Sequence, residues 1–373
     1  MRNMMLWCKD RLVAEPVLVL SALLAVVSMA WVHPSRQYLS YIDWKTLACL
    51  FCLMASVVGL QRERVLERAA LVISMRVPHS RALVLFLVFA CFFLAMAVTN
   101  DVALITLVPI TLAILAACGM EGWSAFVVVL QTLAANIGSS LTPIGNPQNL
   151  YLFSYYGIPL PNFLLTMAPV VLAGGILLAA SCLVVPVSRW TPAPRQKGDP
   201  LRRRPILVYT ALFLLSVAAV FDWLPYGWAV AAVVLTLLVM DRATLGRVDY
   251  SLLATFVCIF VFVGNLGRIG PVHAALSRLT QGYTLWVGIL TSQATSNVPA
   301  AILLSGFTDH ARELLLGVNI GGLGTLIASM ASVISYKLYT GVHKGESLRY
   351  LRLFTVWNLG FLAVLALVGA LLR

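Results

Sequence analysis

The chain has 373 residues, of which 61% are hydrophobic and 11% charged, and it carries a net charge of +12. Its mean hydropathy is +0.92, whereas an ordinary soluble domain has about 25% charged residues. This composition excludes a soluble globular protein and predicts an all-α polytopic membrane protein that lies in a lipid bilayer.

Seven uninterrupted apolar runs approach the ~20 residues that a helix needs to cross a bilayer. In chain order they cover residues 16–32, 43–60, 164–186, 206–222, 226–240, 249–267 and 350–372. The small residues Ser28 and Ala30 would also suit the cleavage site of a signal peptide. However, a second span begins within about ten residues of them, so a retained first span is the better interpretation.

Four further stretches are apolar but interrupted by polar residues and helix breakers. We expect residues 82–118 and 284–305 to enter the membrane and return as re-entrant hairpins. Residues 123–157 and 311–340 are expected to cross once each as discontinuous helices, surrounded by protein or by a water-filled cavity. With the seven uninterrupted runs, this organisation predicts nine crossings.

Lysine and arginine are distributed unequally between the two sides of this topology. Nineteen of the 26 fall on one side, in the N-terminus and in residues 61–81, 187–205, 241–248 and 341–352. By the positive-inside rule that side is cytoplasmic, so we expect an inner-membrane protein with a cytoplasmic N-terminus. The positive charge therefore follows from the topology and requires no nucleic-acid partner.

The second half of the chain resembles the first. Three matched pairs occur in the same order: IDWKTLACLFCLMASVVGL from residue 42 with VDYSLLATFVCIFVFVGNL from residue 248, AVTNDVALI with ATSNVPAAI, and ANIGSSLTPIG with VNIGGLGTLIA. Five predicted crossings separate the first pair, and an odd number inverts the second copy. Inverted repeats with discontinuous helices at their interface are typical of secondary transporters.

The repeat divides the chain into five predicted segments. They are an N-terminal span at 1–42, a first inverted repeat at 43–186, a cytoplasmic linker at 187–205, two spans that lead into the second repeat at 206–240, and a second inverted repeat at 241–373.

The stretch ANIGSSLTPIGNPQNLYLF, residues 135–153, places two glycines, two prolines and several polar side chains inside apolar sequence. Because proline lacks a donor and clashes with the preceding turn, we expect the helix to unwind here. Unwinding frees carbonyl oxygens that can bind a cation and helix N-termini that attract an anion. The alternative is a kinked helix with local hydrogen bonds. Residues 319–328, which contain glycines but no proline, fit that alternative more readily.

The two predicted hairpin tips, VTNDV at 98–102 and SQATSNVP at 292–299, place further polar residues opposite this break. Pro299 suits the first turn of a helix, where its missing N–H is no loss. Asp101 is the one carboxylate that we place near the membrane midplane. An acidic residue at that depth is functional by default, and the alternative is a structural carboxylate satisfied by neighbouring amides.

These motifs resemble the paired hairpin tips and unwound helices of the ion transporter superfamily. That superfamily includes divalent anion:sodium symporters, citrate-transporter-like permeases, arsenite permeases and a class of sodium/proton antiporters. NIGSSLTPIGNPQNLYL and GVNIGGLGTLIASMASVISYKLY are most similar to the bacterial anion permeases of the group. The resemblance covers about residues 43–340 and implies a scaffold domain, an elevator-like transport domain and often a homodimer.

The tips also depart from one branch of that superfamily. In the dicarboxylate branch, the resemblance implies Ser-Asn-Thr tips that bind sodium through the asparagine and carboxylate through the hydroxyls. Here the tips read Thr99-Asn100-Asp101 and Ser296-Asn297-Val298, so the third hydroxyl is missing from both, and one carries an aspartate as in arsenite permeases. An ionised Asp101 would repel a dianion in a low-dielectric site unless a cation or a proton intervened.

We therefore expect a secondary active transporter, not an enzyme, for a small anion that is a carboxylate or an inorganic oxyanion. Its only cofactor would be the coupling ion, Na⁺ or H⁺, and its mechanism would be of the elevator type. The residues expected to bind substrate are Thr99, Asn136, Thr142, Ser296 and Asn319. Na⁺ would lie on Asn100, Gly138, Asn297 and Gly322, and Asp101 would be the coupling residue.

Four alternatives remain open. The first two are an efflux permease for arsenite-like oxyacids and a Na⁺/H⁺ antiporter without an organic substrate. The third is a polytopic membrane enzyme, which would need a nucleophile or an acid/base pair near the membrane surface. The acidic residues at predicted span ends are isolated from one another in sequence, and they are Asp222, Asp241, Asp249 and Glu313. A channel also fits the composition, although two opposed hairpins suit alternating access better.

Overall fold

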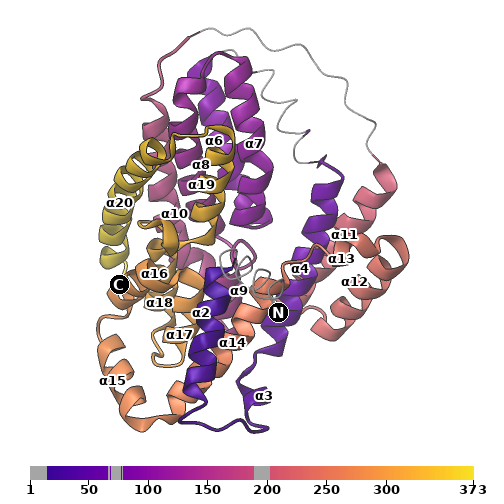
Figure 1. Cartoon of the computed structure of the whole chain (residues 1–373), viewed down its shortest axis with the longest axis vertical. Coiled ribbons are helices and arrows are strands. Elements are labelled where there is room, and N and C mark those ends of the chain that lie inside the picture. The colour runs from indigo at the N-terminus through magenta and orange to yellow at the C-terminus, as the bar shows by residue number, and fades with distance from the viewer. Residues whose placement is uncertain (1–14, 66–67, 69–76, 78, 189–201) are drawn as a thin grey trace, which may run out of the picture.

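Figure 1 shows the computed structural model of the chain, which describes residues 15–65, 68, 77, 79–188 and 202–373. Within these residues the regular secondary structure is helical and contains no β-strand, so the predicted all-α class is confirmed. Most of the linker predicted at 187–205 lies outside the described residues.

The described residues of the first half of the chain form nine helical elements. They are α2 (Pro16–Ser28), α3 (Tyr38–Tyr41), α4 (Trp44–Arg62), α6 (Ser80–Ala97), α7 (Asn100–Ala117), η1 (Glu121–Trp123), α8 (Ser124–Ser139), α9 (Pro147–Tyr155) and α10 (Leu160–Cys182).

The second half, from residue 202 onward, forms eleven. They are α11 (Arg203–Val220), α12 (Tyr226–Met240), α13 (Arg242–Leu245), α14 (Tyr250–Arg268), α15 (Gly270–Thr280), α16 (Thr284–Thr295), α17 (Asn297–Ser305), α18 (Ala311–Gly321), η2 (Leu326–Ala328), α19 (Met330–Val342) and α20 (Ser347–Leu371).

Eight helical segments of the described chain are long and apolar enough to cross a bilayer. Five of them, α4, α10, α11, α14 and α20, fall in runs that the sequence predicts as uninterrupted spans. The other two runs form the shorter apolar helices α2 and α12. The remaining long segments are α6, α7 and the continuous stretch from η1 through α8. The chain is therefore a multi-pass membrane protein.

Both predicted hairpins are helix–turn–helix reversals. α6 turns into α7 at residues 98–99, and α16 turns into α17 at Ser296. In Figure 1 the α6–α7 pair lies in the upper half of the molecule, and the α16–α17 pair lies below it, above α15. α6 and α7 are each 18 residues long, enough to cross a bilayer alone, so re-entry of this hairpin stays a prediction.

Both predicted discontinuous helices are interrupted. α8 ends at Ser139, and α9 begins only at Pro147, which occupies the first helical position where the missing N–H is tolerated. α18 ends at Gly321, and α19 begins at Met330 after a single 3₁₀ turn. Gly324 in this second break has a φ of +104°, a conformation that glycine adopts without steric cost. Glycine alone thus suffices where the second copy lacks proline.

The matched segments at residues 42 and 248 form helices of the same construction. α4 and α14 each contain 19 residues and each end in an arginine, Arg62 and Arg268. Both begin after an aspartate, Asp43 and Asp249, whose carboxylate accepts a hydrogen bond from the backbone N–H three residues later. α4 and α14 therefore share their length, their capping aspartate and their final arginine, as the sequence repeat predicts. The inversion of the two copies stays a prediction.

Glycines allow the first arm of each hairpin to pack closely on the neighbouring broken helix. A Cβ at Gly138 of α8 would lie 2.2 Å from the carbonyl oxygen of Phe92 in α6. A Cβ at Gly317 of α18 would lie 2.6 Å from the carbonyl oxygen of Leu285 in α16. Small residues at such contacts are the usual means by which membrane helices approach each other. Gly138, which the sequence predicts to help bind Na⁺, also makes this contact.

Gly138→Ala is expected to destabilise the protein, because the backbone of α6 must move to admit a methyl group. Overpacking of this kind costs about 1–3 kcal/mol, which a lowered thermal midpoint of the purified protein would report. Gly175→Ala is the matched control, since its Cβ would meet the Phe92 ring at an ordinary 3.6 Å. Equal midpoints for the two variants would show that the α6–α8 contact is not tight.

α4, α11 and α12 pack on one another to the right of the taller group that contains α6, α7, α8, α10, α19 and α20 (Figure 1). Arg62 at the end of α4 forms an ion pair with Asp241, which also accepts hydrogen bonds from Tyr209 and Thr244 at 2.8 Å each. Burial raises the pKa of Asp241, but these three donors lower it more, so the net pKa lies below its ordinary value. The ionised carboxylate thus joins α4, α11 and the α12–α13 turn.

Candidate functional site

A cavity of about 540 Å³ lies where both hairpin tips and both helix breaks meet α4. Its polar wall includes Thr99 and Asp101 at the first tip, Asn146 at the first break and Ser296 at the second tip. Its apolar wall comes largely from one face each of α4 and α19. Segments far apart in the sequence therefore converge on one chamber, as the paired motifs predict.

Four helices begin at this cavity. Their N-cap residues are Thr99 for α7, Asn146 for α9, Ser296 for α17 and Ser329 for α19. Thr99, Asn146, Ser296 and the first residue of α19, Met330, line the cavity. Helix N-termini carry the positive end of the helix dipole. In α7 the first three N–H groups already donate, to Gly145, Asn100 and Thr99, so that helix contributes its dipole rather than free donors. The convergence of the four N-termini makes this a site where negative charge is favoured.

Asn136 of α8 connects the two halves of the site. Its Oδ1 accepts a hydrogen bond from Nδ2 of Asn100 at 3.1 Å and another from the hydroxyl of Ser329 at 2.9 Å. Its Nδ2 is buried and has no hydrogen-bond partner among the described residues. The backbone N–H of Asn100 also donates to the carbonyl of Gly145, at 3.3 Å. The first tip is thus attached to the break after α8.

Asp101 lies in the first turn of α7 and faces the cavity. Its Oδ1 is buried and has no hydrogen-bond partner among the described residues. The nearby N-terminus of α7 favours the negative charge, but a buried ionised oxygen without a donor is costly. A proton or a metal cation on the carboxylate would remove that cost.

Two of the four residues expected to hold Na⁺ lie against each other in the structure, and the other two have other neighbours. Asn297 lies directly against Gly322, because a Cβ at Gly322 would be 2.9 Å from Nδ2 of Asn297. Asn100 instead contacts Asn136, and the carbonyl of Gly138 accepts a hydrogen bond from the Leu141 backbone at 3.1 Å. The structure therefore pairs the second tip with its glycine but not the first.

The five residues expected to bind substrate also divide. Thr99 and Ser296 line the cavity. Asn136 is not among its lining residues, but it bonds to Asn100 beside Thr99 and to Ser329 beside Met330. Thr142 donates to the Met96 carbonyl at 2.6 Å and so attaches the first break to the end of α6. This placement gives Thr142 a structural role.

Asn319 connects the two broken helices to each other. Its Nδ2 donates to Oδ1 of Asn149 at 2.7 Å, and its Oδ1 accepts from Gln148 at 3.4 Å. Asn149 in turn donates to the carbonyls of Ser139, Ser140 and Thr142, at 3.2–3.3 Å, and so satisfies the end of α8. Because these amides are committed to one another, Asn319 does not line the cavity.

The model of the citrate transporter family matches residues 4–332. The chain belongs to the citrate transporter family. It is 33% identical to an uncharacterized transporter of Methanocaldococcus jannaschii over 302 residues, which cover 80% of this chain and 82% of that relative.

Two further relatives of this citrate transporter family member are similar over most of its length. An inner membrane protein of Escherichia coli is 29% identical over 316 residues, 81% of this chain and 82% of the relative. A magnetosome protein of Magnetospirillum gryphiswaldense is 24% identical over 371 residues, 88% and 84% of the two chains. The predicted likeness to citrate-transporter-like permeases is confirmed, and the chain is a multi-pass membrane transporter.

Sequence reasoning missed part of the cavity wall of this family member. On α19, Met330, Val333, Ile334 and Lys337 line the cavity at helical spacing, and Arg247 lies at the same chamber. The spacing of three and four residues was a usable signal for one face of a helix. The ammonium of Lys337 makes no hydrogen bond or ion pair among the described residues, so the wall presents a cation to an entering anion.

Sequence reasoning also missed the backbone conformation of Ser296, which has a φ of +76° and a ψ of 153°. A side chain disfavours this region, and residues held there cluster at functional sites. Ser296→Gly is expected to be about 1–2 kcal/mol more stable than Ser296→Ala, although both lack the hydroxyl. Thermal midpoints would measure the difference, and a more stable alanine variant would contradict a strained conformation.

Proposed function

We propose that the chain is a secondary active transporter that binds a small anion, a carboxylate or an inorganic oxyanion, in the central cavity. The observation that carries the proposal is the convergence of the N-termini of α7, α9, α17 and α19 on that cavity. Its volume of about 540 Å³ suits a small molecule, since such sites measure about 300–1,000 Å³. The wall carries the cations Lys337 and Arg247 together with the carboxylates Glu15, Asp101 and Asp249.

Asp101 is the proposed coupling residue. Its buried, unpartnered oxygen among the described residues supports a carboxylate that takes up H⁺ or Na⁺ together with the anion. Cation binding would neutralise the carboxylate, and the repulsion between Asp101 and the bound anion would then disappear. Loading of the two ligands becomes mutually favourable, which is the thermodynamic requirement for symport.

An elevator-type movement would take place along α4. Leu50, Leu53, Met54 and Val57 present an apolar face of this helix to the cavity. The opposite wall is formed by the tips and by α19. An apolar face offers few hydrogen bonds that must be broken when one group slides past the other, whereas the Arg62–Asp241 pair holds α4 to its own group.

The proposal is tested by transport into proteoliposomes. Carboxylates, phosphate, sulfate and arsenite would be offered under an imposed Na⁺ gradient and, separately, under an imposed proton gradient. Accumulation of an anion under one gradient, with competition by its unlabelled form, is the expected result. Ion exchange without accumulation of any of these solutes would instead support a Na⁺/H⁺ antiporter, the candidate favoured by the unpartnered oxygen of Asp101.

The cavity reaches the end of the molecule that bears Gln61 and Arg247, which is the cytoplasmic end in our predicted topology. A cysteine at the exposed Ser188 is expected to react with a membrane-impermeant reagent only from the cytoplasm. The matched control is a cysteine at the exposed Arg36, which should react only from the opposite side. Both cysteines belong in a background without the native thiols, and reversed labelling would overturn the orientation.

A further inference from the structure

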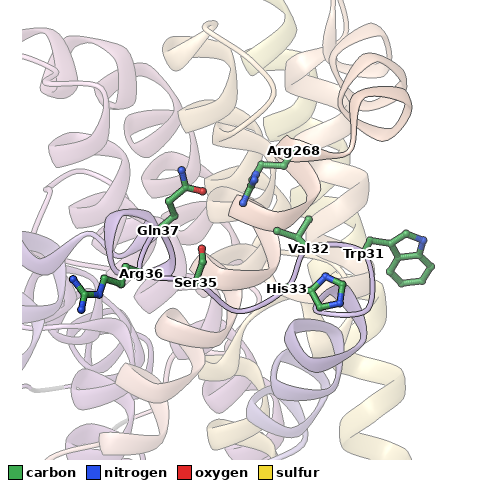
Figure 2. A pocket seen from close by; sticks show the side chains of 7 residues that line it. All are labelled: Trp31, Val32, His33, Ser35, Arg36, Gln37 and Arg268. Atoms are coloured by element: carbon green, nitrogen blue, oxygen red, sulfur yellow. The ribbon is translucent and has the colours of Figure 1, made fainter.

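A second hollow, of about 630 Å³, lies far from the central cavity, between the loop after α2 and the end of α14 (Figure 2). Its polar lining consists of His33, Ser35, Arg36, Gln37 and Arg268. All five side chains can donate hydrogen bonds, and no lining residue among those described carries a carboxylate. Figure 2 shows the ends of Arg268 and Gln37 turned toward each other, with Arg36 extending outward.

The loop that forms this hollow is held in place by a buried asparagine of α14. Nδ2 of Asn265 donates to the hydroxyl of Ser28 at 2.9 Å and to that of Tyr38 at 3.0 Å. The Tyr38 hydroxyl in turn donates to the Val32 carbonyl at 2.5 Å. The ring of Tyr41 covers Gly264, where a Cβ would come within 2.4 Å of it. The donors are therefore preorganised, which lowers the entropy cost of binding a ligand.

The internal repeat shows what Arg268 lacks. Arg62 ends α4 and forms an ion pair with Asp241. Arg268 ends the matched helix α14, and no ion pair connects it to a carboxylate among the described residues. In our topology only six cationic residues lie on this side of the membrane, and two of them, Arg36 and Arg268, line this one hollow. An anionic ligand would supply the missing charge.

The surroundings indicate where that anion comes from. The apolar residues Leu20, Leu23, Val26 and Val27 of α2 are 47–63% exposed on the helix that leads to the hollow. Trp31, which lines the hollow, is 66% exposed, as is typical of tryptophan at a membrane–water interface. Acyl chains could therefore lie along α2 while the headgroup reaches the arginines.

We propose that this hollow binds the phosphate of an anionic phospholipid in the membrane leaflet on that side. Arginine matches phosphate with two parallel hydrogen bonds, and Gln37, Ser35 and His33 supply further donors. The bound lipid would hold the α2–α3 loop and α14 together. The site is separate from the central cavity and does not depend on which anion the protein transports.

The test uses the full-length protein, purified in detergent and freed of lipid. The thermal midpoint is measured against increasing phosphatidylglycerol, phosphatidylcholine or inorganic phosphate. Phosphatidylglycerol should raise the midpoint at a lower concentration than phosphatidylcholine. Arg36→Gln and Arg268→Gln should each raise the half-saturating concentration of phosphatidylglycerol about fivefold. This factor corresponds to about 1 kcal/mol, the attraction between one arginine and an anionic lipid surface.

Arg278→Gln is the matched control, since Arg278 lies on the same predicted side but does not line the hollow, and its half-saturation should stay unchanged. Arg268→Lys keeps the charge and loses the fork, so it should lie between wild type and Arg268→Gln. Unaltered phosphatidylglycerol binding by the double Arg36→Gln, Arg268→Gln variant would overturn the proposal. Equal protection by inorganic phosphate alone, lost in the same variants, would overturn the lipid as its source.

Discussion

Asp101→Asn is expected to abolish accumulation of the substrate while leaving exchange across the membrane intact. The asparagine has nearly the same shape but neither takes up a proton nor balances a metal cation. A tenfold gradient of one coupling cation can drive about tenfold accumulation of substrate, since both correspond to the same free energy. The variant should therefore equilibrate the substrate to a ratio of about one.

Two measurements separate this loss of coupling from simple misfolding. Counterflow exchange, which needs no cation gradient, should continue in Asp101→Asn at a rate near that of the wild type. Asp249→Asn is the matched control, because Asp249 also lines the cavity but caps α14 through the Leu252 backbone. That variant should keep coupled accumulation. A wild-type accumulation ratio in Asp101→Asn would remove Asp101 from the coupling mechanism.

Lys337→Gln is expected to raise the apparent KM for the anion about tenfold with little change in the maximal rate. Lys337 lines the cavity from α19 and has no partner of opposite charge among the described residues. A hydrogen bond to a charged group contributes about 1.5–3 kcal/mol, so loss of one such contact accounts for at least a tenfold weaker binding. The effect should appear in KM because the contact that the variant lacks is one that forms when the anion binds.

Lys344→Gln is the control for this variant. Lys344 is exposed in the turn between α19 and α20 and does not line the cavity, yet its removal changes the net charge by the same amount. Initial rates of anion uptake over a range of concentrations would give both constants. An unchanged KM in Lys337→Gln, or an equal rise in Lys344→Gln, would show that Lys337 makes no direct contact with the anion.

The sequence was sufficient for features that depend on local backbone chemistry. The prolines and glycines at 138–147 predicted an interrupted helix, because proline cannot donate the bond that would continue it, and α8 does end at Ser139. The reversals at Thr99 and Ser296 were likewise visible as short polar segments between apolar arms. The apolar runs predicted most of the long helices, since length and hydropathy set what can cross a bilayer.

Only the tertiary structure decided which polar atoms face the cavity. Thr142 and Asn319 carry the same chemistry as Thr99 and Asn146, which line the cavity, but they bond instead to Met96 and Asn149. Those partners lie 46 and 170 residues away in the chain, so no local pattern could reveal them. A side chain is available to a ligand only when folding leaves it unpaired, and that depends on contacts between segments distant in the sequence.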